Sequence, residues 1–299
     1  MSSSPTYAYY PGCSGQGTSL EYETSSRAVC EALGVVLHDI PDWSCCGSTP
    51  AHTVDHVLSA ALSARNLAQA ETLTGVEGIA TPCPSCLTNL KTAGRRMLDP
   101  QFKERVNSLL DTPVKQPLPA KSVLQVLFED VGPAALKERV VKPLAGLKVA
   151  PYYGCILNRP PEVMEFDDCE NPIAMDRLLE ALGAEVVPFP LKVECCGASF
   201  GMPRKDMVMR LSGKLLDVAE DNGAMAMATA CPLCQMNLDL RQSQINATSG
   251  KQHNMPVFYY TQLIGLALGL DKRLLGLNKL CVNPKAALQA AEQATAGAA

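Results

Sequence analysis

The sequence lacks three features, and each absence narrows the range of functions. It has no excess of basic residues, since 26 Lys and Arg face 30 Asp and Glu, and this argues against a nucleic-acid binder. It has no apolar run of about 18 residues, so we expect no transmembrane segment. It does not begin with a basic region followed by an apolar stretch, so we expect no secretory signal. These absences predict a cytoplasmic location, with attachment to a membrane only as a peripheral part of a complex.

Cysteine is the residue that the chain has in excess. Thirteen cysteines among 299 residues are many for a chain without an export signal. The odd number and the expected reducing compartment argue against a framework of disulfides. Clustered thiols in such a compartment more often bind metal or carry out redox chemistry. Apolar residues make up 47% of the chain, enough for real cores, and the length suggests two domains.

An internal repeat organises the chain. A Gly-Cys pair, a Cys-Cys-Gly motif and a Cys-Pro-x-Cys-x-x-Asn-Leu motif occur in this order twice, at offsets of 142 to 150 residues. Such an ordered recurrence indicates a duplicated domain. Three prolines within 112–119 end the first copy, because proline breaks helices and central strands. We therefore predict a first domain over 1–112, a linker with a helix over 113–146, a second domain over 147–275 and a tail over 276–299.

Short apolar segments alternate with helical ones in each copy. We expect strands at 7–10, 35–40 and 78–80, and again at 148–152, 185–189 and 224–228. We expect helices at 19–33, 53–73, 172–182, 205–220, after each Cys-Pro-x-Cys motif, and as an amphipathic helix at 257–270. This alternation predicts parallel strands joined by right-handed crossovers. The expected fold class is α/β, with two tandem, duplicated small domains that have parallel sheets and are related by a pseudo-two-fold axis.

Each copy places five cysteines after predicted strands, in turns or at helix starts. The candidate ligands are Cys13, Cys45, Cys46, Cys83 and Cys86 in the first copy and Cys155, Cys195, Cys196, Cys231 and Cys234 in the second. Open α/β sheets build their sites at the carboxyl ends of strands, and a helix N-terminus stabilises a thiolate. Five thiolates exceed the four that a tetrahedral zinc ion uses, so they favour an iron–sulfur cluster. A zinc site with a spare cysteine in each copy is the alternative.

Several other residues near the motifs have a less specific pattern. Three basic residues are candidates for binding an anionic substrate, with structural ion pairs as the alternative: Arg159, Arg204 and Lys205. Three cysteines outside the repeat are expected to be small buried residues: Cys30, Cys169 and Cys281. For Cys169 a reactive thiol is the alternative. His52 and His56 have a spacing that can bind metal, but they have no counterpart in the second copy and are expected on a helix surface.

The order Cys, Cys-Cys-Gly, Cys-x-x-Cys resembles the CCG domain, and two copies in one chain resemble the B subunit of heterodisulfide reductase. The resemblance covers about 7–270 and is strongest around Cys155, Cys195-Cys196-Gly197 and Cys231-Pro232-Leu233-Cys234. It implies that each set of five cysteines holds one non-cubane 4Fe-4S cluster, and that the two clusters flank one substrate site. It also implies an oxidoreductase acting on sulfur groups, without flavin in this chain, that cleaves or forms the S–S bond of a disulfide or of protein-bound sulfane sulfur.

The resemblance further implies two partners from the same type of complex, a ferredoxin-like iron–sulfur protein (the C subunit) and a flavin-containing protein (the A subunit). Similar proteins in other systems leave an alternative, an electron-transfer or quinone-reducing CCG subunit of a fumarate reductase or glycerol-phosphate dehydrogenase type of complex. The sequence shows no strongly amphipathic basic helix for a membrane surface, which favours the first interpretation. The first spacer has 31 residues between Cys13 and Cys45 and 39 between Cys155 and Cys195, so the two sites need not be identical.

Overall fold

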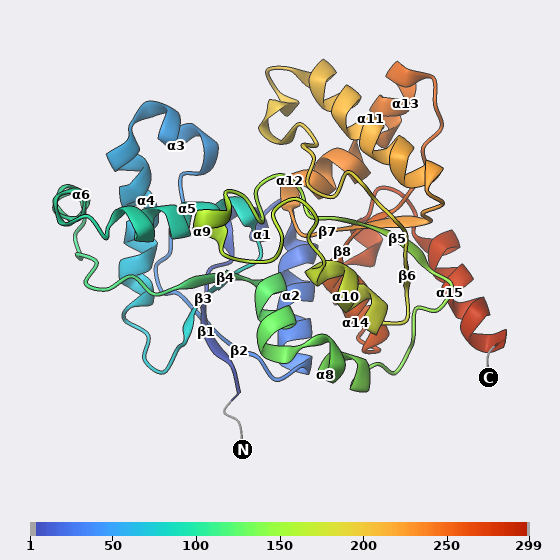
Figure 1. Cartoon of the computed structure of the whole chain (residues 1–299), viewed down its shortest axis with the longest axis horizontal. Helices are drawn as coiled ribbons and strands as arrows, with labels where there is room; N and C mark the ends of the chain where they lie inside the picture. The colour runs from blue at the N-terminus through green and yellow to red at the C-terminus, as the bar shows by residue number, and fades with distance from the viewer. Residues whose placement is uncertain (1–3, 298–299) are drawn as a thin grey trace.

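The computed structural model describes residues 4–297 and contains two four-stranded parallel sheets (Figure 1). The first has the order β2 (Val36–Asp39), β1 (Thr6–Tyr9), β3 (Gly78–Thr81) and β4 (Ala120–Ser122). The second has the order β6 (Glu185–Val186), β5 (Lys148–Tyr152), β7 (Ala226–Thr229) and β8 (Val257–Tyr259). Corresponding strands take the same places in both sheets, which confirms the predicted duplicated α/β fold. Residues 1–3 of the predicted first domain and 298–299 of the predicted tail lie outside the described residues.

The fourth strand of each sheet differs from the sequence prediction. β4 pairs with β3 and lies in the segment expected to be a linker, so the first sheet extends beyond residue 112. β8 pairs with β7 and takes up the start of the expected helix over 257–270. Three-residue strands are too short to show a periodic pattern, and strands buried on both faces need not alternate between apolar and polar residues. β6 is shorter than expected because Pro188 and Pro190 interrupt its ladder.

Helices of the first half cover its sheet and lead into the second half. They are α1 (Gly12–Gly15), α2 (Leu20–Ala32), α3 (Ser48–Val54), α4 (His56–Ala70), α5 (Pro84–Arg96), α6 (Pro100–Asn107), α7 (Val123–Val126), the π-helix η1 (Leu127–Val131) and α8 (Pro133–Glu138). The single helix expected over 53–73 is interrupted at Asp55, whose backbone is extended. Its carboxylate accepts the N–H groups of Val57 and Leu58, each at 2.7 Å, and so caps α4.

Helices of the second half follow a broadly similar order. They are α9 (Pro161–Met164), α10 (Ala174–Ala181), the 3₁₀ turn η2 (Ala198–Gly201), α11 (Lys205–Asp221), α12 (Pro232–Gln235), the π-helix η3 (Met236–Leu240), α13 (Gln242–Ser249), α14 (Tyr260–Ala267), the 3₁₀ turn η4 (Leu277–Lys279) and α15 (Lys285–Gly297). The Cys-Pro-x-Cys motif opens a helix in both halves, as predicted. In the second half that helix passes at once into a π turn, whereas α5 is regular throughout.

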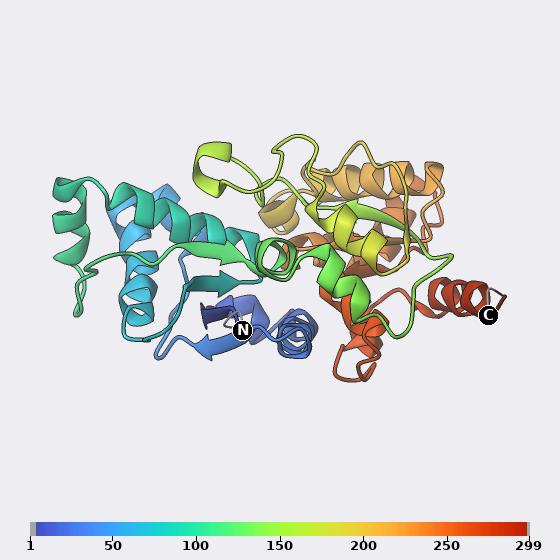
Figure 2. The ribbon, with the colours of Figure 1, turned by 60° about the horizontal axis from the view of Figure 1, so that its bottom comes forward.

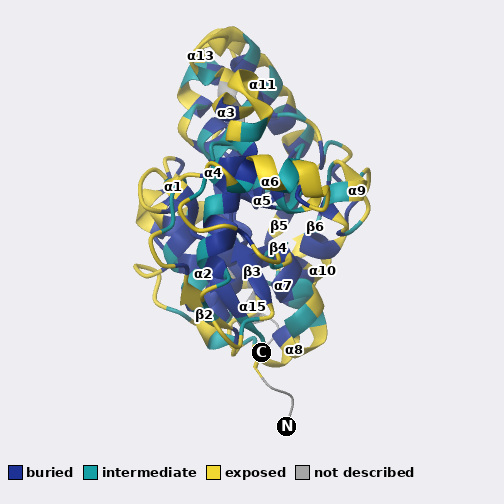
Figure 3. Cartoon of the chain, turned by 90° about the vertical axis from the view of Figure 1, so that its left-hand side faces the viewer, coloured by how far each residue is buried: buried dark blue, intermediate teal, exposed yellow. Residues whose placement is uncertain are grey.

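The two halves pack against each other through corresponding helices, which lie between the sheets (Figure 2). α2 packs on α14, and α10 packs on α7 and η1. Since α7 follows β4 as α14 follows β8, these two contacts correspond, as a pseudo-two-fold relation requires. The ring of Tyr22 in α2 stacks on that of Tyr259, with centroids 4.1 Å apart and an interplanar angle of 3°. One hydrophobic core therefore runs through the interface, with buried strands at the centre and exposed residues outside (Figure 3).

The lengths and compositions of the helices bear on whether the chain enters a bilayer. Within residues 4–297, no helix is both long and apolar enough to span a membrane. The segment 257–270, expected to be an amphipathic helix, carries the α14 helix, whose residues are all buried. The apolar face of α14 therefore packs in the core of this chain and not on a partner.

Candidate functional site

The five candidate cysteines of the first half come together beyond the carboxyl ends of its strands. Cys13 lies in α1, directly after β1, and the vicinal cysteines lie in the loop between β2 and α3. Cys83 is the N-cap residue of α5, and Cys86 lies in its first turn. The sulfur atoms of Cys46 and Cys86 are 3.6 Å apart. Burial raises the pKa of the Cys13 thiol, and the nearby thiols of Cys45, Cys46 and Cys83 raise it further, so all five lie close to one another.

The second half repeats this arrangement. Cys155 lies in the turn after β5, Cys231 is the N-cap residue of α12 and Cys234 lies in its first turn. The sulfur atoms of Cys196 and Cys234 are 3.5 Å apart. Cys195 hydrogen-bonds Cys155, and this interaction raises the pKa of the Cys155 thiol. The structure therefore brings the ten cysteines together in two groups, one in each half.

The arrangement of the thiols bears on the kind of metal. A zinc ion needs four ligand atoms about 2.0–2.3 Å from one point. Within the described chain, no three Cys, His, Asp or Glu side chains form such a group around a single ion. A cluster with several iron atoms does not require its thiolates to converge on one point. Metal analysis of the purified protein decides between zinc and an iron–sulfur cluster.

A glycine passes close to a cysteine sulfur in each half. Gly12 has φ +71°, and a Cβ atom there would lie 2.9 Å from the Cys86 sulfur. Gly154 has φ +77°, and a Cβ atom there would lie 3.1 Å from the Cys234 sulfur. Only glycine combines the left-handed conformation with this close approach. The Gly-Cys pair of the repeat thus lets the chain fold tightly over the Cys-Pro-x-Cys helix.

A buried tyrosine holds the loop of the vicinal cysteines in each half. Tyr10 donates its hydroxyl to the Ser44 carbonyl, and Tyr152 donates to the Glu194 carbonyl, each at 2.7 Å. Both carbonyls belong to the residue just before the cysteine pair. Burial, followed by the nearby thiols, raises the pKa of both tyrosines, so they stay protonated as donors. The tyrosines therefore fix the backbone that presents the vicinal thiols.

A buried serine fixes the same loop from the other side. Ser63 in α4 donates to the Cys46 carbonyl at 3.2 Å, and Ser212 in α11 donates to the Cys196 carbonyl at 2.8 Å. Neither serine was assigned a role from the sequence. Their offset of 149 residues falls within the range of the repeat, so an alignment of the two halves would have found them.

An asparagine from the Cys-Pro-x-Cys-x-x-Asn motif reaches a vicinal cysteine in each half. The Asn89 amide nitrogen lies 3.6 Å from the Cys46 sulfur, and that of Asn237 lies 3.5 Å from the Cys196 sulfur. Both amides are positioned to donate N–H···S hydrogen bonds. The sequence shows these asparagines as part of the repeat but does not reveal what they contact.

The second cysteine of each vicinal pair is poised to lose its proton. The hydrogen bond shared with Cys86 lowers the pKa of Cys46 to about 6, and the bond shared with Cys234 lowers that of Cys196 to about 7. The pKa of each partner thiol, Cys86 and Cys234, is raised in turn by the same hydrogen bond. Backbone N–H groups also point at the second site, since Ala198 N lies 3.3 Å from the Cys196 sulfur. Thiolate is the form of cysteine that binds metal.

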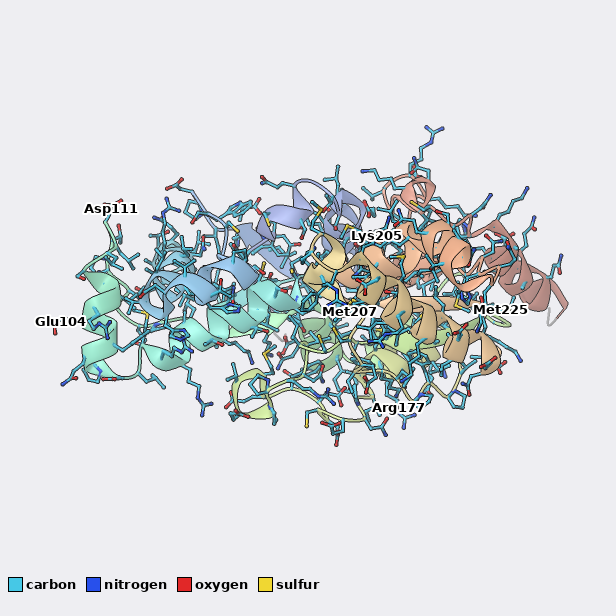
Figure 4. All side chains as sticks on the ribbon, turned by 90° about the horizontal axis from the view of Figure 1, so that it is seen from above. Glu104, Asp111, Arg177, Lys205, Met207 and Met225 are labelled. Carbon is cyan, nitrogen blue, oxygen red and sulfur yellow. The ribbon has the colours of Figure 1, made fainter. Side chains whose placement is uncertain are left out.

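The candidate basic residues have different surroundings. The half-buried Arg159 donates to the carbonyls of Cys169, at 2.9 Å, and Val193, at 3.3 Å, and pairs with Glu170 at 2.6 Å. These bonds tie its segment to the loop before Cys195. Arg204 is exposed and pairs with Asp206 at 2.9 Å, while Lys205 is exposed at the start of α11 (Figure 4). A role of these residues in substrate binding stays a prediction.

The cysteines outside the repeat differ in burial. Cys30 is buried, as predicted, and burial raises the pKa of its thiol to about 12. Cys169 is partly buried. The expectation for Cys281 was wrong, because its side chain is exposed. Its backbone N–H donates to the Asp239 carboxylate at 2.6 Å, so the backbone of this segment is tied down while the thiol faces outward.

The segment between Cys155 and Cys195 is longer than its counterpart in the first half, and its extra residues connect the two halves. α9 lies in this spacer and packs against α5, the helix that begins at Cys83. The side chains of Lys91 and Arg95 in α5 donate to the carbonyls of Met164 and Glu162 in α9. The longer spacer thus links the second half to the helix that carries two candidate ligands of the first.

The tyrosine stack links the two cysteine sites. The Tyr22 hydroxyl donates to the Ala230 carbonyl at 3.0 Å, and Ala230 directly precedes Cys231. The pKa of Tyr259 is raised by burial and, to a smaller extent, by the thiols of both Cys231 and Cys83. Tyr259 therefore lies within electrostatic range of one cysteine from each site.

Comparison with known proteins agrees with the duplicated architecture. The family described as CCG, cysteine-rich domain, matches residues 7–91 and 149–239. The membrane anchor subunit of the 8-methylmenaquinol:fumarate reductase of Wolinella succinogenes is 36% identical over 91% of this chain and 95% of its own length. The B subunit of the ferredoxin:CoB-CoM heterodisulfide reductase of Methanosarcina mazei is 31% identical over 87% of this chain and 88% of its own length. A protein of Archaeoglobus profundus, named for its likeness to the heterodisulfide reductase B subunit, is 32% identical over 93% and 95%, respectively.

One solved structure is similar in fold. A hypothetical protein from Helicobacter pylori superposes with a TM-score of 0.73 at 14% sequence identity. The match covers 93% of this chain and 52% of that protein, so the chain spans about half its length. At this identity the likeness concerns the fold alone.

Proposed function

Since the chain belongs to the CCG cysteine-rich domain family, of which it carries two copies, we propose that it is an iron–sulfur electron-transfer subunit of a multi-subunit reductase. The observation that carries this proposal is the pair of five-thiol groups at corresponding places in the two halves. The relatives that match most of the chain are named as subunits of reductases, which supports an oxidoreductase role.

We propose that each group of five cysteines holds one non-cubane 4Fe-4S cluster. The ligands would be Cys13, Cys45, Cys46, Cys83 and Cys86 in the first half and Cys155, Cys195, Cys196, Cys231 and Cys234 in the second. The residues present fit such a group, because the thiols are close together, several have lowered pKa values, and amide N–H groups face two of the sulfur atoms. When bound, the clusters would supply one-electron transfer and iron sites with affinity for sulfur. No flavin is proposed in this chain.

The proposed reaction is cleavage or formation of an S–S bond, in a disulfide or in protein-bound sulfane sulfur. Two sites joined by one interface could serve the two sulfur atoms of such a bond, and the relatives of 31% and 32% identity support this interpretation. The chain itself would orient the thiolates through Tyr10 and Tyr152 and keep the sites together through the Tyr22–Tyr259 stack. We further propose that a ferredoxin-like C subunit, together with a flavin-containing A subunit, delivers or accepts the electrons at a cytoplasmic site peripheral to a membrane.

A second candidate function rests on the 36% identical relative. Its name assigns it to a complex that links a methylmenaquinol to fumarate, so the present chain could pass electrons between a quinol and a dehydrogenase-type partner. Its clusters would then act only as an electron path. The two candidates differ in the acceptor or donor that the purified protein turns over.

Metal analysis of anaerobically purified protein tests the proposal. We expect iron and acid-labile sulfide in the wild type, loss of about half of both in Cys196→Ala, and no loss in Cys281→Ala, which removes an exposed thiol outside both groups. Zinc in place of iron, or full iron in Cys196→Ala, would contradict it. Two assays separate the candidates. Catalysed oxidation of a reduced viologen by a disulfide supports the first candidate, and reduction of the protein's clusters by a menaquinol analogue supports the second.

A further inference from the structure

The second cysteine site has a charged group in its hydrogen-bond network. Asn237, which is fully buried, directs its amide N–H groups to the Cys196 sulfur at 3.5 Å and to the Ala198 carbonyl at 3.3 Å. The Arg241 guanidinium donates its Nε–H to the Asn237 amide oxygen at 3.1 Å. A positive charge is therefore connected to the thiol through a single amide group.

The first site lacks this connection. Asn89 directs its amide nitrogen to the Cys46 sulfur at 3.6 Å and to the Cys46 carbonyl at 3.3 Å. The residue four positions further on, which corresponds to Arg241, is the buried Ala93. Among the side chains that the structure describes, none donates a hydrogen bond to the Asn89 amide oxygen. Asn89 is also partly exposed, so water screens its dipole more than that of Asn237.

The fold makes room for the guanidinium. A Cβ atom on Gly201 would lie 2.7 Å from Arg241 Nη2, so a glycine at this place lets the guanidinium lie against the loop that follows Cys196. Gly201 has no left-handed backbone, so its missing side chain matters here for space and not for backbone conformation. The π turn η3 lies just before Arg241, and such turns occur frequently at functional sites. In the first half the same stretch is a regular α-helix.

Other charges also lie near the second site. The negative charge of Glu194, next to Cys195, opposes an added electron there, but its side chain is exposed, so water screens it. The Asp239 carboxylate accepts the N–H groups of Cys281, at 2.6 Å, and Val282, at 3.4 Å. Two residues apart on a helix, Asp239 and Asn237 point to opposite faces, so the carboxylate faces away from the Cys196 sulfur. Arg204 and Asp206 form an exposed pair whose charges compensate each other and are screened by water.

We propose that Arg241, acting through Asn237, makes the second site the easier of the two to reduce. The inference rests on the proposed function, since it requires a cluster at each site. An added electron increases the negative charge on a cluster and its sulfur ligands. A hydrogen bond to a sulfur stabilises that charge, and the guanidinium strengthens this bond by polarising the amide. Arg241 is thus a positioning and charge-tuning residue, and an incoming electron resides first in the second half.

A redox titration of the holoprotein tests the inference. The protein is reduced stepwise with dithionite and redox dyes, and the cluster signals are followed by electron paramagnetic resonance. We expect two midpoint potentials in the wild type. In Arg241→Gln the higher of these two potentials should fall, and the lower potential should stay unchanged. Arg210→Gln removes an exposed charge from α11 of the same half and should leave both potentials in place.

Further variants assign the two signals and separate charge from structure. Asn237→Leu should lower the same midpoint as Arg241→Gln, and Asn89→Leu should lower the other one. Arg241→Lys keeps the charge and should recover part of the shift.

The possible results distinguish the inference from the proposed function. A single shared midpoint in the wild type, or equal shifts of both midpoints in Arg241→Gln, overturns the inference while leaving the clusters in place. If Arg241→Gln does not retain iron, Arg241→Lys and Asn237→Leu decide the question, and unchanged potentials in Asn237→Leu overturn the inference. Absence of iron from the wild type overturns the proposed function, and the inference with it.

Discussion

Replacing Gly12 with alanine tests how closely the chain must approach the cysteines. Gly12 has φ +71°, and the new Cβ atom would lie 2.9 Å from the Cys86 sulfur. Gly34 offers a matched control, because it also has a left-handed backbone, with φ +82°, but no atom lies within 4 Å of a Cβ placed there. The two substitutions share the backbone cost and differ in the contact with the sulfur.

The expected magnitude follows from these two terms. A left-handed conformation costs a non-glycine residue roughly 1–2 kcal/mol, which is the whole effect expected for Gly34→Ala. Forcing an extra carbon into a packed contact costs about 1–3 kcal/mol more. We therefore expect Gly12→Ala to lower the free energy of unfolding by about 2–5 kcal/mol. It should also reduce the iron bound by the first half, because the Cys86 sulfur must move.

Urea unfolding under anaerobic conditions measures the stability, and iron analysis measures cluster occupancy. Gly154→Ala places its Cβ atom 3.1 Å from the Cys234 sulfur and should act in the same way, but less strongly, on the second half. The reasoning is refuted if Gly12→Ala and Gly34→Ala lose equal stability and both retain full iron.

Three other predictions concern charges and thiols. Lys192→Met should lower stability by about 3–5 kcal/mol in urea unfolding, because it removes the charged partner, 2.5 Å away, of the buried Asp176 carboxylate and leaves it only the Tyr153 hydroxyl. Adding Asp176→Leu should recover part of the loss, and an equal loss in both variants would contradict this. In iron-free protein, iodoacetamide should label Cys195 faster than Cys155 at pH 7, because the hydrogen bond from Cys155 lowers the pKa of Cys195 to about 6. This labelling should slow as the pH falls from 7 to 5, since the thiolate is lost below its pKa, and a rate that begins to rise only above pH 8 would speak against it. Arg159→Gln should lower stability by roughly 1–3 kcal/mol without raising KM for a disulfide, because Arg159 makes its hydrogen bonds within the protein. A raised KM at unchanged stability would instead assign Arg159 to substrate binding.

Much of the architecture was predictable because its patterns are local. The strands before Cys13 and Cys155 and the helices that begin at Pro84 and Pro232 lie where the sequence indicated them. The fourth strands were missed, since each has three residues and gains its identity by pairing with a neighbour. The break at Asp55 was missed for a similar reason, because the aspartate acts as a cap only when the next turn is present.

The surroundings of the thiols were less predictable than the thiols themselves. Ser63 and Ser212 lie in long helices and look like ordinary helix residues until the cysteine loop folds onto them. The hydrogen bonds that Arg159 donates to the carbonyls of Cys169 and Val193 were likewise not visible in the sequence, and its role in substrate binding stays a prediction.

By itself, the sequence determined that this chain is a duplicated α/β protein with two sets of five thiols, because motif order and spacing record which groups follow which strands. Only the tertiary structure decided that Tyr22 joins the two halves and that Arg241 reaches Asn237 at one site while Ala93 stands at the other. Hydrogen bonds and ring stacking depend on distances in space. Residues far apart in the chain acquire those distances only when the sheets and helices have packed.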